Sequence, residues 1–354
     1  MLRKRDYLGE WINGLPIGCE LCIEGDKTVI FVTGACHDNC FYCPISLERR
    51  SMEAFYVDEE RITSIDDLLS YIEIVGGRGA SITGGDPLVV LDKTLEIIKA
   101  LKNSFGERFH IHLYTSGRYA DLGALKALER AGLDEIRFHP INEKYWSRIE
   151  LAKRYTSMRV GAEIPAIPGQ EDYLMRLIMF LESIGADFIN LNELEVSETN
   201  KEALLFRGFR INPDGVTISG SRELALKILS WGREKGLKIK IHYCPARLKD
   251  AIQTIKRLRR ISERVKAPHQ RISVDGLLRW LEIYVDKRDL DLEKTLLSYG
   301  YEYFYSGGVY YVDPFAEKLA RDLGKRYRLR LIERSPVVLG GVERRNIIEN
   351  IYDL

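Results

Sequence analysis

Long apolar runs are missing from this 354-residue sequence, and so is a large excess of charge of either sign. No stretch approaches the roughly 20 apolar residues that a membrane-spanning helix needs. Residues 1–13 contain basic side chains without the apolar run of a signal peptide. The formal net charge is +1, so any surface for a polyanion must be local. We therefore expect a cytoplasmic protein that does not associate with membranes.

Cysteine is scarce but clustered. Six cysteines in a chain of this length do not make the disulfide framework of a secreted domain, and their concentration near the N-terminus indicates metal binding in a reducing compartment. The length allows about two domains, and a hydrophobic content of 45% is enough for a large core. Charged residues reach 30%, with Lys, Arg and Glu dominating over Asn and Gln, a composition that leans towards a thermophile.

Strand-like and helix-like stretches alternate from Thr28 to about Cys244. This alternation predicts βαβ units with parallel strands, and hence an α/β sheet or barrel. We expect strands near residues 28–33, 79–83, 109–114, 134–138, 159–163, 187–192 and 238–243. The expected helices are Ser64–Gly76, Leu91–Phe105, Leu122–Ala131, Asn142–Lys153, Glu171–Ile184 and Ser221–Lys235. Residues 1–27 contain several glycines and a proline, and we expect them to be irregular.

Three of the expected strands carry polar side chains at every second position: Phe109–Tyr114, Glu135–His139 and Ile239–Cys244. Because side chains alternate between the two faces of a strand, each of these has one apolar and one polar face. If helices cover the apolar faces, the polar faces line a wet cavity inside a curved sheet, which is a large hydrophilic substrate site. The alternative is an open sheet with one solvated face.

Three cysteines follow the first expected strand in one short loop. Thr28–Val32 is rich in β-branched residues, and Cys36, Cys40 and Cys43 come next with the spacing C-x3-C-x2-C. Three thiolates on one loop are able to hold three corners of an iron–sulfur cube, which leaves one iron open to a further ligand. The alternatives are a zinc knuckle or three buried thiols, although such clustered cysteines favour a metal site.

The other three cysteines form a second candidate group. Cys19 and Cys22 make a C-x2-C pair ahead of the first strand, and Cys244 ends the seventh strand. In a parallel α/β fold that strand end lies on the rim that also carries the cysteine loop. With His242, water or substrate as a fourth ligand, they predict zinc or a second iron–sulfur cluster. The alternative is a redox pair or loop thiols at Cys19 and Cys22, with Cys244 in the core.

The pattern changes after residue 245. Arg247–Arg271 is helix-like and strongly basic, and Pro268 ends it. The order β-α-β-β-α-β then follows, which predicts a small α+β domain of the ferredoxin-like type. Its two middle strands are joined by Ser306-Gly307-Gly308, a strong hairpin signal. We expect an N-terminal cysteine-containing extension at residues 1–27 and a barrel at residues 28–245. A basic helical linker at residues 246–271 and the small domain at residues 272–354 follow.

The cysteine loop resembles the signature of the radical S-adenosylmethionine (radical SAM) superfamily, C-x3-C-x-aromatic-C, with Tyr42 in the aromatic slot. The run GCELC…TGACHDNCFYCP is closest to an archaeal branch of pyruvate formate-lyase activating enzyme-like members. Over residues 28–245 the resemblance implies a partial barrel of the (β/α)6 type, with a [4Fe-4S] cluster on Cys36, Cys40 and Cys43. It also implies S-adenosylmethionine at the open iron, and reductive cleavage of this cofactor to a 5'-deoxyadenosyl radical that abstracts hydrogen from a substrate. The electron then comes from a reduced ferredoxin or flavodoxin-type donor.

The resemblance also assigns cofactor-binding residues. Gly84, Gly85, Asp86 and Pro87 match a Gly-Gly-Glu-Pro type turn that receives the methionine amino group, with Asp86 in place of the usual Glu. Tyr42 is expected to approach the adenine by stacking or by a backbone contact. Ser116 and Glu163 lie at the ends of later strands, where family members bind the ribose and carboxylate of the cofactor. Asn192, at the end of the sixth strand, is a candidate for binding either the cofactor or the substrate.

Three functions remain in competition. The leading hypothesis is a radical SAM enzyme that modifies a macromolecule such as tRNA, bound through Arg247–Arg271. The second is a protein-radical activase or peptide-modifying enzyme, although the chain lacks the tandem ferredoxin-type cysteine motifs of activases with extra electron-relay clusters. The third is a non-enzymatic, zinc-stabilised binding protein. A basic run such as Arg247–Arg271 is more often an ordinary solvated surface.

Overall fold

A computed structural model describes residues 9–314, 323–336, 338 and 349–353. The chain divides into two compact units. Unit 1 comprises Met1–Leu69 and Gly77–Gln253, and unit 2 comprises Ser70–Gly76 and Thr254–Leu354. Within the described residues, no helix combines the length and the apolar character needed to cross a membrane.

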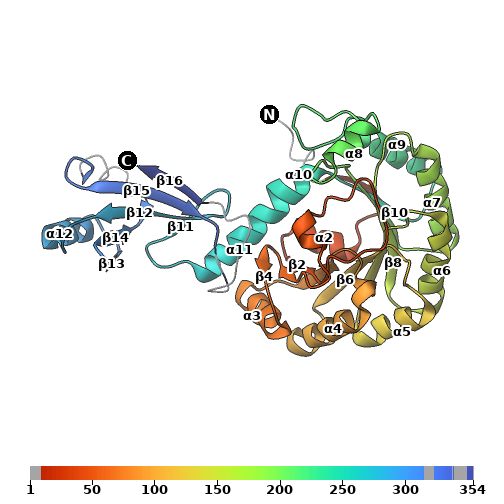
Figure 1. The fold of residues 1–354 in the computed structure, drawn as a ribbon, viewed down its shortest axis with the longest axis horizontal. Coiled ribbons are helices and arrows are strands. Elements are labelled where there is room, and N and C mark those ends of the chain that lie inside the picture. The colour runs from red at the N-terminus through yellow and green to blue at the C-terminus, as the bar shows by residue number, and fades with distance from the viewer. Residues whose placement is uncertain (1–8, 315–322, 337, 339–348, 354) are drawn as a thin grey trace. The chain divides into compact units, whose positions relative to one another are not determined.

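Unit 1 is built on a curved sheet of parallel strands that are neighbours in space in the same order as in the sequence. This order places every crossover helix on the same side of the sheet, and in Figure 1 the helices surround the strands. The parallel strands are β2 (Lys27–Phe31), β5 (Gly79–Thr83), β6 (His110–Thr115), β7 (Glu135–Phe138), β8 (Arg159–Pro165), β9 (Phe188–Asn192) and β10 (Lys240–Cys244). Six helix-containing crossovers join these strands, so the prediction of a partial (β/α)6-type barrel is confirmed.

The crossover helices follow the predicted boundaries closely. They are α3 (Ile65–Val75), α4 (Leu91–Phe105), α5 (Leu122–Ala131), α6 (Trp146–Tyr155), α7 (Glu171–Ser183) and α9 (Ser221–Glu234). Helix α5 shows why: the Asp121 side chain accepts a hydrogen bond from the Ala124 N–H, and Gly132 ends the helix at a φ of +99°. An N-cap carboxylate and a left-handed glycine satisfy backbone groups that the helix itself leaves unpaired.

Several short elements were not predicted. Strand β1 (Glu10–Ile12) pairs antiparallel with β10, while β3 (Tyr56–Val57) and β4 (Glu60–Arg61) extend the other edge of the sheet. Helix α2 (Ile17–Ile23) lies in the segment that we expected to be irregular. Two residues expected to break any helix, Gly14 and Pro16, precede α2 and do not interrupt it. Gly14 has a φ of +96°, and Pro16 is the N-cap residue. Helix α8 (Lys201–Phe206) lies between β9 and α9.

Helix α2 lies inside the curve of the sheet, surrounded by the parallel strands (Figure 1). Its Cys19 side chain is buried beside Arg137 on β7 and Asn190 on β9. The expected division of faces is therefore present, because the apolar side chains of the strands pack under the helices and the polar ones point inward. The inner polar side chains, however, are covered by the chain's own α2: Arg137 is 2% exposed and His242 is 1% exposed. At these positions the interior is filled by the protein itself, and the expected wet cavity is not present there.

Unit 2 has the strand order and the first helix of the predicted ferredoxin-like arrangement. Its antiparallel sheet has the order β13-β14-β12-β15-β16, and β11 also pairs with β12. The elements are β11 (Arg271–Ile272), β12 (Leu278–Tyr284), α12 (Leu290–Ser298), β13 (Tyr303–Ser306), β14 (Val309–Val312), β15 (Arg328–Arg334) and β16 (Glu349–Asp353). The second predicted helix, residues 314–323, lies almost entirely outside the described residues. Leu281, Ile283 and Tyr310 are at the centre of the core.

The predicted basic helix Arg247–Arg271 is interrupted. The observed elements are α10 (Ala246–Leu248), a π-helical turn (Lys249–Thr254) and α11 (Ile255–Val265). Within unit 2, Arg260 Nε donates to the carbonyl of Val75 at 3.1 Å, and Arg264 Nη1 donates to two carbonyls of the same last turn of α3. The final carbonyls of a helix have no partner within the helix. These two arginines therefore have a structural role as cation caps.

Candidate functional site

The cysteine loop begins at the carboxyl end of β2. Its first residues continue the sheet pairing, because the Val32 N–H donates to the Thr83 carbonyl at 2.9 Å. The Gly34 N–H donates to the Ser51 carbonyl at 2.8 Å. A Cβ atom on Gly34 would collide with the Arg49 backbone, so glycine is required at this close approach. The entry of the loop is thereby held between β5 and residues 49–51.

The three thiols of this loop match the donor set of an iron–sulfur cluster. Cys36 is exposed, and Cys40 and Cys43 are half-buried. The pKa of Cys40 is raised to about 11, mainly by burial and in part by the nearby Cys43 and Cys36 thiols, while a Tyr42 hydrogen bond opposes the rise. The three sulfurs therefore lie close enough to influence one another. Soft thiolate donors from one accessible loop, one fewer than a cube needs, fit a [4Fe-4S] cluster with an open iron.

The Gly84–Pro87 turn packs directly on the cysteine loop. The Gly85 N–H donates to the Thr33 carbonyl at 2.7 Å, and the Asp86 N–H donates to the Ala35 carbonyl at 2.8 Å. A Cβ atom on either glycine would overlap with these carbonyls, so the close approach excludes every other residue type. Two motifs some 40 residues apart in sequence thus form one backbone-bonded unit.

Asp86 and Ser116 also come together, through their side chains. The Asp86 carboxylate accepts from the Ser116 hydroxyl at 2.8 Å, from the Thr115 hydroxyl at 3.0 Å and from the Leu88 N–H at 3.0 Å. The carboxyl group is almost completely buried, and burial raises its pKa although these donors oppose the rise. Asp86 therefore joins the turn to the end of β6, and its oxygens are occupied by protein donors.

Tyr42 points towards the barrel. Its hydroxyl lies 2.9 Å from Nε2 of His139, which follows β7, and its carbonyl accepts from the Asn200 side chain at 2.9 Å. The neighbouring Phe41 ring stacks on Phe209 with an interplanar angle of 5°. The segment between β9 and α9 thus supports the aromatic residues of the cysteine loop. This support was not predicted from the sequence.

Glu163, on β8, is the centre of a hydrogen-bonded network. Its carboxylate accepts from Arg137 at 2.7 Å, from Asn190 at 2.9 Å and from Asn192 at 3.0 Å. Burial alone raises the pKa of Glu163, but Arg137 and the two amides outweigh it, and the pKa is lowered. Glu163 is therefore held as a carboxylate that accepts from Asn192. Cofactor binding by these two residues stays a prediction.

Arg137 was not singled out from the sequence, although its place in the polar alternation of β7 was noted. It is buried and ion-paired with both Glu135, at 2.5 Å, and Glu163, at 2.7 Å. Its Nη2 atom also lies 3.5 Å from the Cys19 sulfur. One guanidinium thus links α2, β7 and β8. Only the barrel geometry brings these partners together.

The second cysteine group comes from two elements: Cys19 and Cys22 lie on α2, and Cys244 lies on β10. Cys19 accepts from the Asn190 amide at 3.2 Å inside the barrel. Burial raises the pKa of both Cys19 and Cys22. Cys244 ends β10 and pairs in register with Asn192. Within the described part of the chain, no three His, Cys, Asp or Glu side chains are arranged to hold a metal ion. This finding includes Cys36, Cys40 and Cys43, whose match to a cluster rests on their donor chemistry and spacing. A second metal site at these cysteines stays a prediction.

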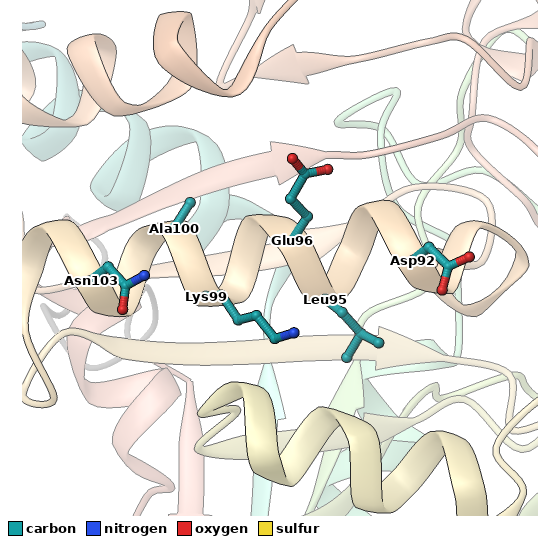
Figure 2. A pocket seen from close by; sticks show the side chains of 6 residues that line it. All are labelled: Asp92, Leu95, Glu96, Lys99, Ala100 and Asn103. Carbon is teal, nitrogen blue, oxygen red and sulfur yellow. The ribbon is translucent and has the colours of Figure 1, made fainter.

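A hollow of about 380 Å³ lies along α4, the helix that follows the Gly84–Pro87 turn (Figure 2). Its lining consists of Asp92, Leu95, Glu96, Lys99, Ala100 and Asn103. All six belong to one helix, and none was predicted to bind a cofactor. We assign it no role in the site.

Comparisons with known proteins agree with this geometry. Residues 30–141 match the model of the Radical SAM superfamily. The chain is 40% identical over 297 residues to the Methanocaldococcus jannaschii protein named "Putative glycyl-radical enzyme activating enzyme MJ0021", which covers 80% of this chain and 78% of that protein.

Two solved structures resemble this chain at a lower sequence identity than the M. jannaschii protein does. Streptococcus suis SuiB bound to the precursor peptide SuiA is 11% identical, with a TM-score of 0.45, and the match covers 62% of this chain and 48% of SuiB. This chain therefore spans about half of SuiB. Escherichia coli coproporphyrinogen III oxidase (HemN), titled a radical SAM enzyme, is 12% identical with a TM-score of 0.40, covering 64% of this chain and 58% of that one.

The identity and coverage of the M. jannaschii relative decide the family. The relative comes from a thermophilic archaeon, in agreement with the expectation from composition and from the cysteine-rich run. The resemblance stated from the Cys36–Cys43 loop is confirmed. The chain is an enzyme of the radical SAM superfamily and belongs to its pyruvate formate-lyase activating enzyme-like branch.

Proposed function

We propose that Cys36, Cys40 and Cys43 hold a [4Fe-4S] cluster and that the Gly84–Pro87 turn receives S-adenosylmethionine beside it. Together these cofactors supply a 5'-deoxyadenosyl radical, which abstracts hydrogen from a substrate. The protein's own contribution is to hold the cluster, orient the cofactor and control access. A reduced ferredoxin or flavodoxin-type protein is the proposed electron donor.

The observation that carries this proposal is the packing of the Gly84–Pro87 turn on the cysteine loop. The hydrogen bonds from Gly85 and Asp86 to Thr33 and Ala35 fix the two motifs in one position. Beyond the turn, Asp86 fixes Ser116, and Arg137 keeps Glu163 ionised. These residues therefore offer a preformed polar edge at the carboxyl ends of β5, β6 and β8, where parallel α/β folds place ligands.

The test is anaerobic reconstitution followed by iron counting and product analysis. The wild-type protein is expected to bind about four irons at this cluster and to form 5'-deoxyadenosine when it is reduced in the presence of S-adenosylmethionine. Cys36→Ala should lose the cluster and the product together. Ser104→Ala, on exposed α4, is the matched control and should keep both. A Cys36→Ala protein that retains iron and product would contradict the proposal.

The substrate is proposed to be a macromolecule, either RNA or a protein. The name of the M. jannaschii relative supports the protein alternative, in which the chain activates a glycyl-radical enzyme. The expected result is then a glycyl-radical electron paramagnetic resonance signal in a partner protein. The capping roles of Arg260 and Arg264 make the RNA surface predicted at Arg247–Arg271 smaller than its charge indicates.

A second metal at Cys19, Cys22 and Cys244 is part of the proposal with its own measurement. Zinc and iron are counted in the wild type and in a Cys19→Ser, Cys22→Ser, Cys244→Ser variant. Loss of one zinc, or of iron beyond the first cluster, supports the site. Four irons, no zinc and no change in the variant would remove it.

A further inference from the structure

Unit 2 presents an aromatic row on one face of its antiparallel sheet. Strand register aligns Phe304 on β13 with Tyr311 on β14, Tyr311 with Glu282 on β12, and Glu282 with Arg330 on β15. Tyr284, two residues beyond Glu282 on β12, lies on the same face. We call Phe304, Tyr311, Tyr284 and Arg330 the aromatic face.

The aromatic face is the side of the sheet that faces away from the main core. The alternate residues of β12, Leu281 and Ile283, are buried together with Tyr310 in the core that packs against α12. Side chains alternate along a strand, so Glu282 and Tyr284 point to the other side. Phe304 is 56% exposed there. Tyr284 and Tyr311 are half-buried, and Tyr311 also packs against the buried Leu278, Trp280 and Ile332. Phe304 is therefore the most accessible ring of this face.

The rings are already arranged for stacking. His269 lies against Phe304 with 6.4 Å between ring centroids and an interplanar angle of 14°, and its centroid is 5.8 Å from that of Tyr311. The guanidinium groups of Arg328 and Arg330 lie 5.6 and 5.4 Å from the centre of the Tyr284 ring. Planar rings and guanidinium groups side by side provide flat surfaces on which nucleobases stack.

Two acidic residues, Glu282 and Asp353, lie on this face, and both have partners within it. Asp353 on β16 lies 2.9 Å from Arg330 and 3.9 Å from Arg328, so a phosphate would compete with it for these arginines. The Glu282 carboxylate accepts from the Trp280 indole N–H at 3.1 Å and from the Tyr284 hydroxyl at 2.7 Å. The surrounding charge is positive: residues 254–354 contain 20 Lys and Arg against 15 Asp and Glu. Residues 1–253 contain 33 against 37. The near-neutral whole chain therefore conceals a cationic part, which is the one that carries the aromatic face.

We propose that the aromatic face of unit 2 binds a single-stranded nucleic acid, with bases stacked on Phe304, Tyr311 and Tyr284 and phosphates near Arg328 and Arg330. Bases in a duplex are stacked on one another, so only an unpaired segment offers them to these rings. The proposal deepens the macromolecular substrate of the proposed function and rests on that function for its catalytic meaning. The binding itself requires neither the cluster nor S-adenosylmethionine.

The test is fluorescence anisotropy of the full-length protein with a labelled single-stranded oligoribonucleotide of mixed sequence. The same sequence as single-stranded DNA and as duplex RNA gives the comparison arms. Single strands should bind more tightly than the duplex, and the ratio of RNA to DNA affinity assigns the natural ligand. Phe304→Ala and Tyr311→Ala should each weaken binding by about 5- to 100-fold, the range measured for loss of one base-stacking ring.

Two further variants separate stacking from charge. Arg330→Gln should reduce the slope of log affinity against log salt by about 0.7, the value for one phosphate contact on a single strand. Tyr299→Ala removes a ring that is 62% exposed at the end of α12, off the aromatic face, and should leave binding unchanged. Absence of binding at low salt, equal loss in Tyr299→Ala, or no loss in Phe304→Ala would overturn the proposal.

The same preparations keep this result distinct from that of the proposed function. Each variant is also assayed for iron content and for 5'-deoxyadenosine formed without added substrate. Normal values with lost RNA affinity support the aromatic face as the binding site. Wild-type protein that forms 5'-deoxyadenosine but binds no nucleic acid overturns the proposal and leaves the radical chemistry standing. Protein that binds RNA but forms no 5'-deoxyadenosine supports the aromatic face as a binding site and contradicts the proposed radical chemistry.

Discussion

The two sheets of this chain alternate polar with apolar side chains, and they treat the polar side in opposite ways. In unit 1 the polar side faces inward, where α2 covers it and Arg137 is 2% exposed. In unit 2 the corresponding side carries Phe304, which is 56% exposed, and Arg330, whose side chain is 29% exposed. Buried charges must be paired because they have lost water, whereas surface charges need no partner. The alternation pattern alone therefore does not reveal where a polar face ends up.

The largest effect is expected from removing the buried cation. Arg137→Met leaves Glu135 and Glu163 in the barrel without their shared partner, and should lower the free energy of unfolding of unit 1 by about 3–5 kcal/mol. Urea unfolding and hydrogen exchange of peptides from β7 and β8 measure the loss. A change below about 1 kcal/mol would show that the buried network is not what distinguishes the two sheets.

Acidification should affect unit 1 next most strongly. Burial lowers the pKa of His110 to about 3 and that of His242 to about 4, from an ordinary value of 6.5. Below pH 6.5 the unfolded chain binds protons at these positions and the folded chain does not, so stability falls as the pH drops. Each group contributes about 1.4 kcal/mol per pH unit until its folded pKa is reached.

The measurement is urea unfolding of the full chain at pH 7, 6 and 5, with hydrogen exchange assigning the loss to β6 and β10. His242→Gln should reduce the slope of the free energy of unfolding against pH by the contribution of one histidine, about 1.4 kcal/mol per pH unit. An unchanged slope in this variant would contradict the assignment to His242.

A smaller effect is expected where α2 enters the barrel. A Cβ atom on Gly18 would lie 2.5 Å from His112 Nδ1 and 2.7 Å from Glu135 Oε1. Gly18→Ala should therefore cost about 1–3 kcal/mol through overpacking, and calorimetry should show a lower melting temperature. If the variant is as stable as the wild type, α2 is not held tightly against the inner strands.

The smallest effect on stability is expected on the aromatic face. Arg330 is ion-paired with Asp353 at 2.9 Å, but the Asp353 side chain is 69% exposed. Arg330→Met should change the free energy of unfolding of unit 2 by less than about 1 kcal/mol, the usual worth of an exposed pair. The same urea and hydrogen-exchange measurements as for Arg137→Met give a direct contrast between the two arginines.

Much of the fold follows from local sequence signals. The boundaries of α4 and α5 were predicted exactly, because apolar periodicity, the Asp121 cap and Gly132 all act within a few residues. Short elements such as β1, α2 and β16 were missed. They have too few residues for a periodic signal, and their positions depend on pairing with β10, the barrel interior and β15.

The candidate site also has features that local sequence predicts and features that depend on tertiary contacts. The cysteine spacing and the Gly-Gly-Asp-Pro turn were visible in sequence because each is a continuous motif. The contact between these two motifs was not visible in the sequence. Neither were the anchoring of Ser116 by Asp86 and the ionisation of Glu163. Ser116 is far from Asp86 in the chain, and Arg137 and Asn190 are far from Glu163. Only neighbouring parallel strands bring these side chains within hydrogen-bond distance.

By itself, the sequence determined the radical SAM cysteine loop, the order of strands and helices, and the ferredoxin-like pattern, because these depend on residues that are neighbours in the chain. Tertiary structure alone decided that α2 covers the polar interior and that Arg137 holds Glu163 as a carboxylate. It also decided that Phe304, Tyr311 and Tyr284 share one face of the second sheet. The physical reason is that burial, charge pairing and exposure are properties of the space between elements, and no single stretch of the chain contains that space.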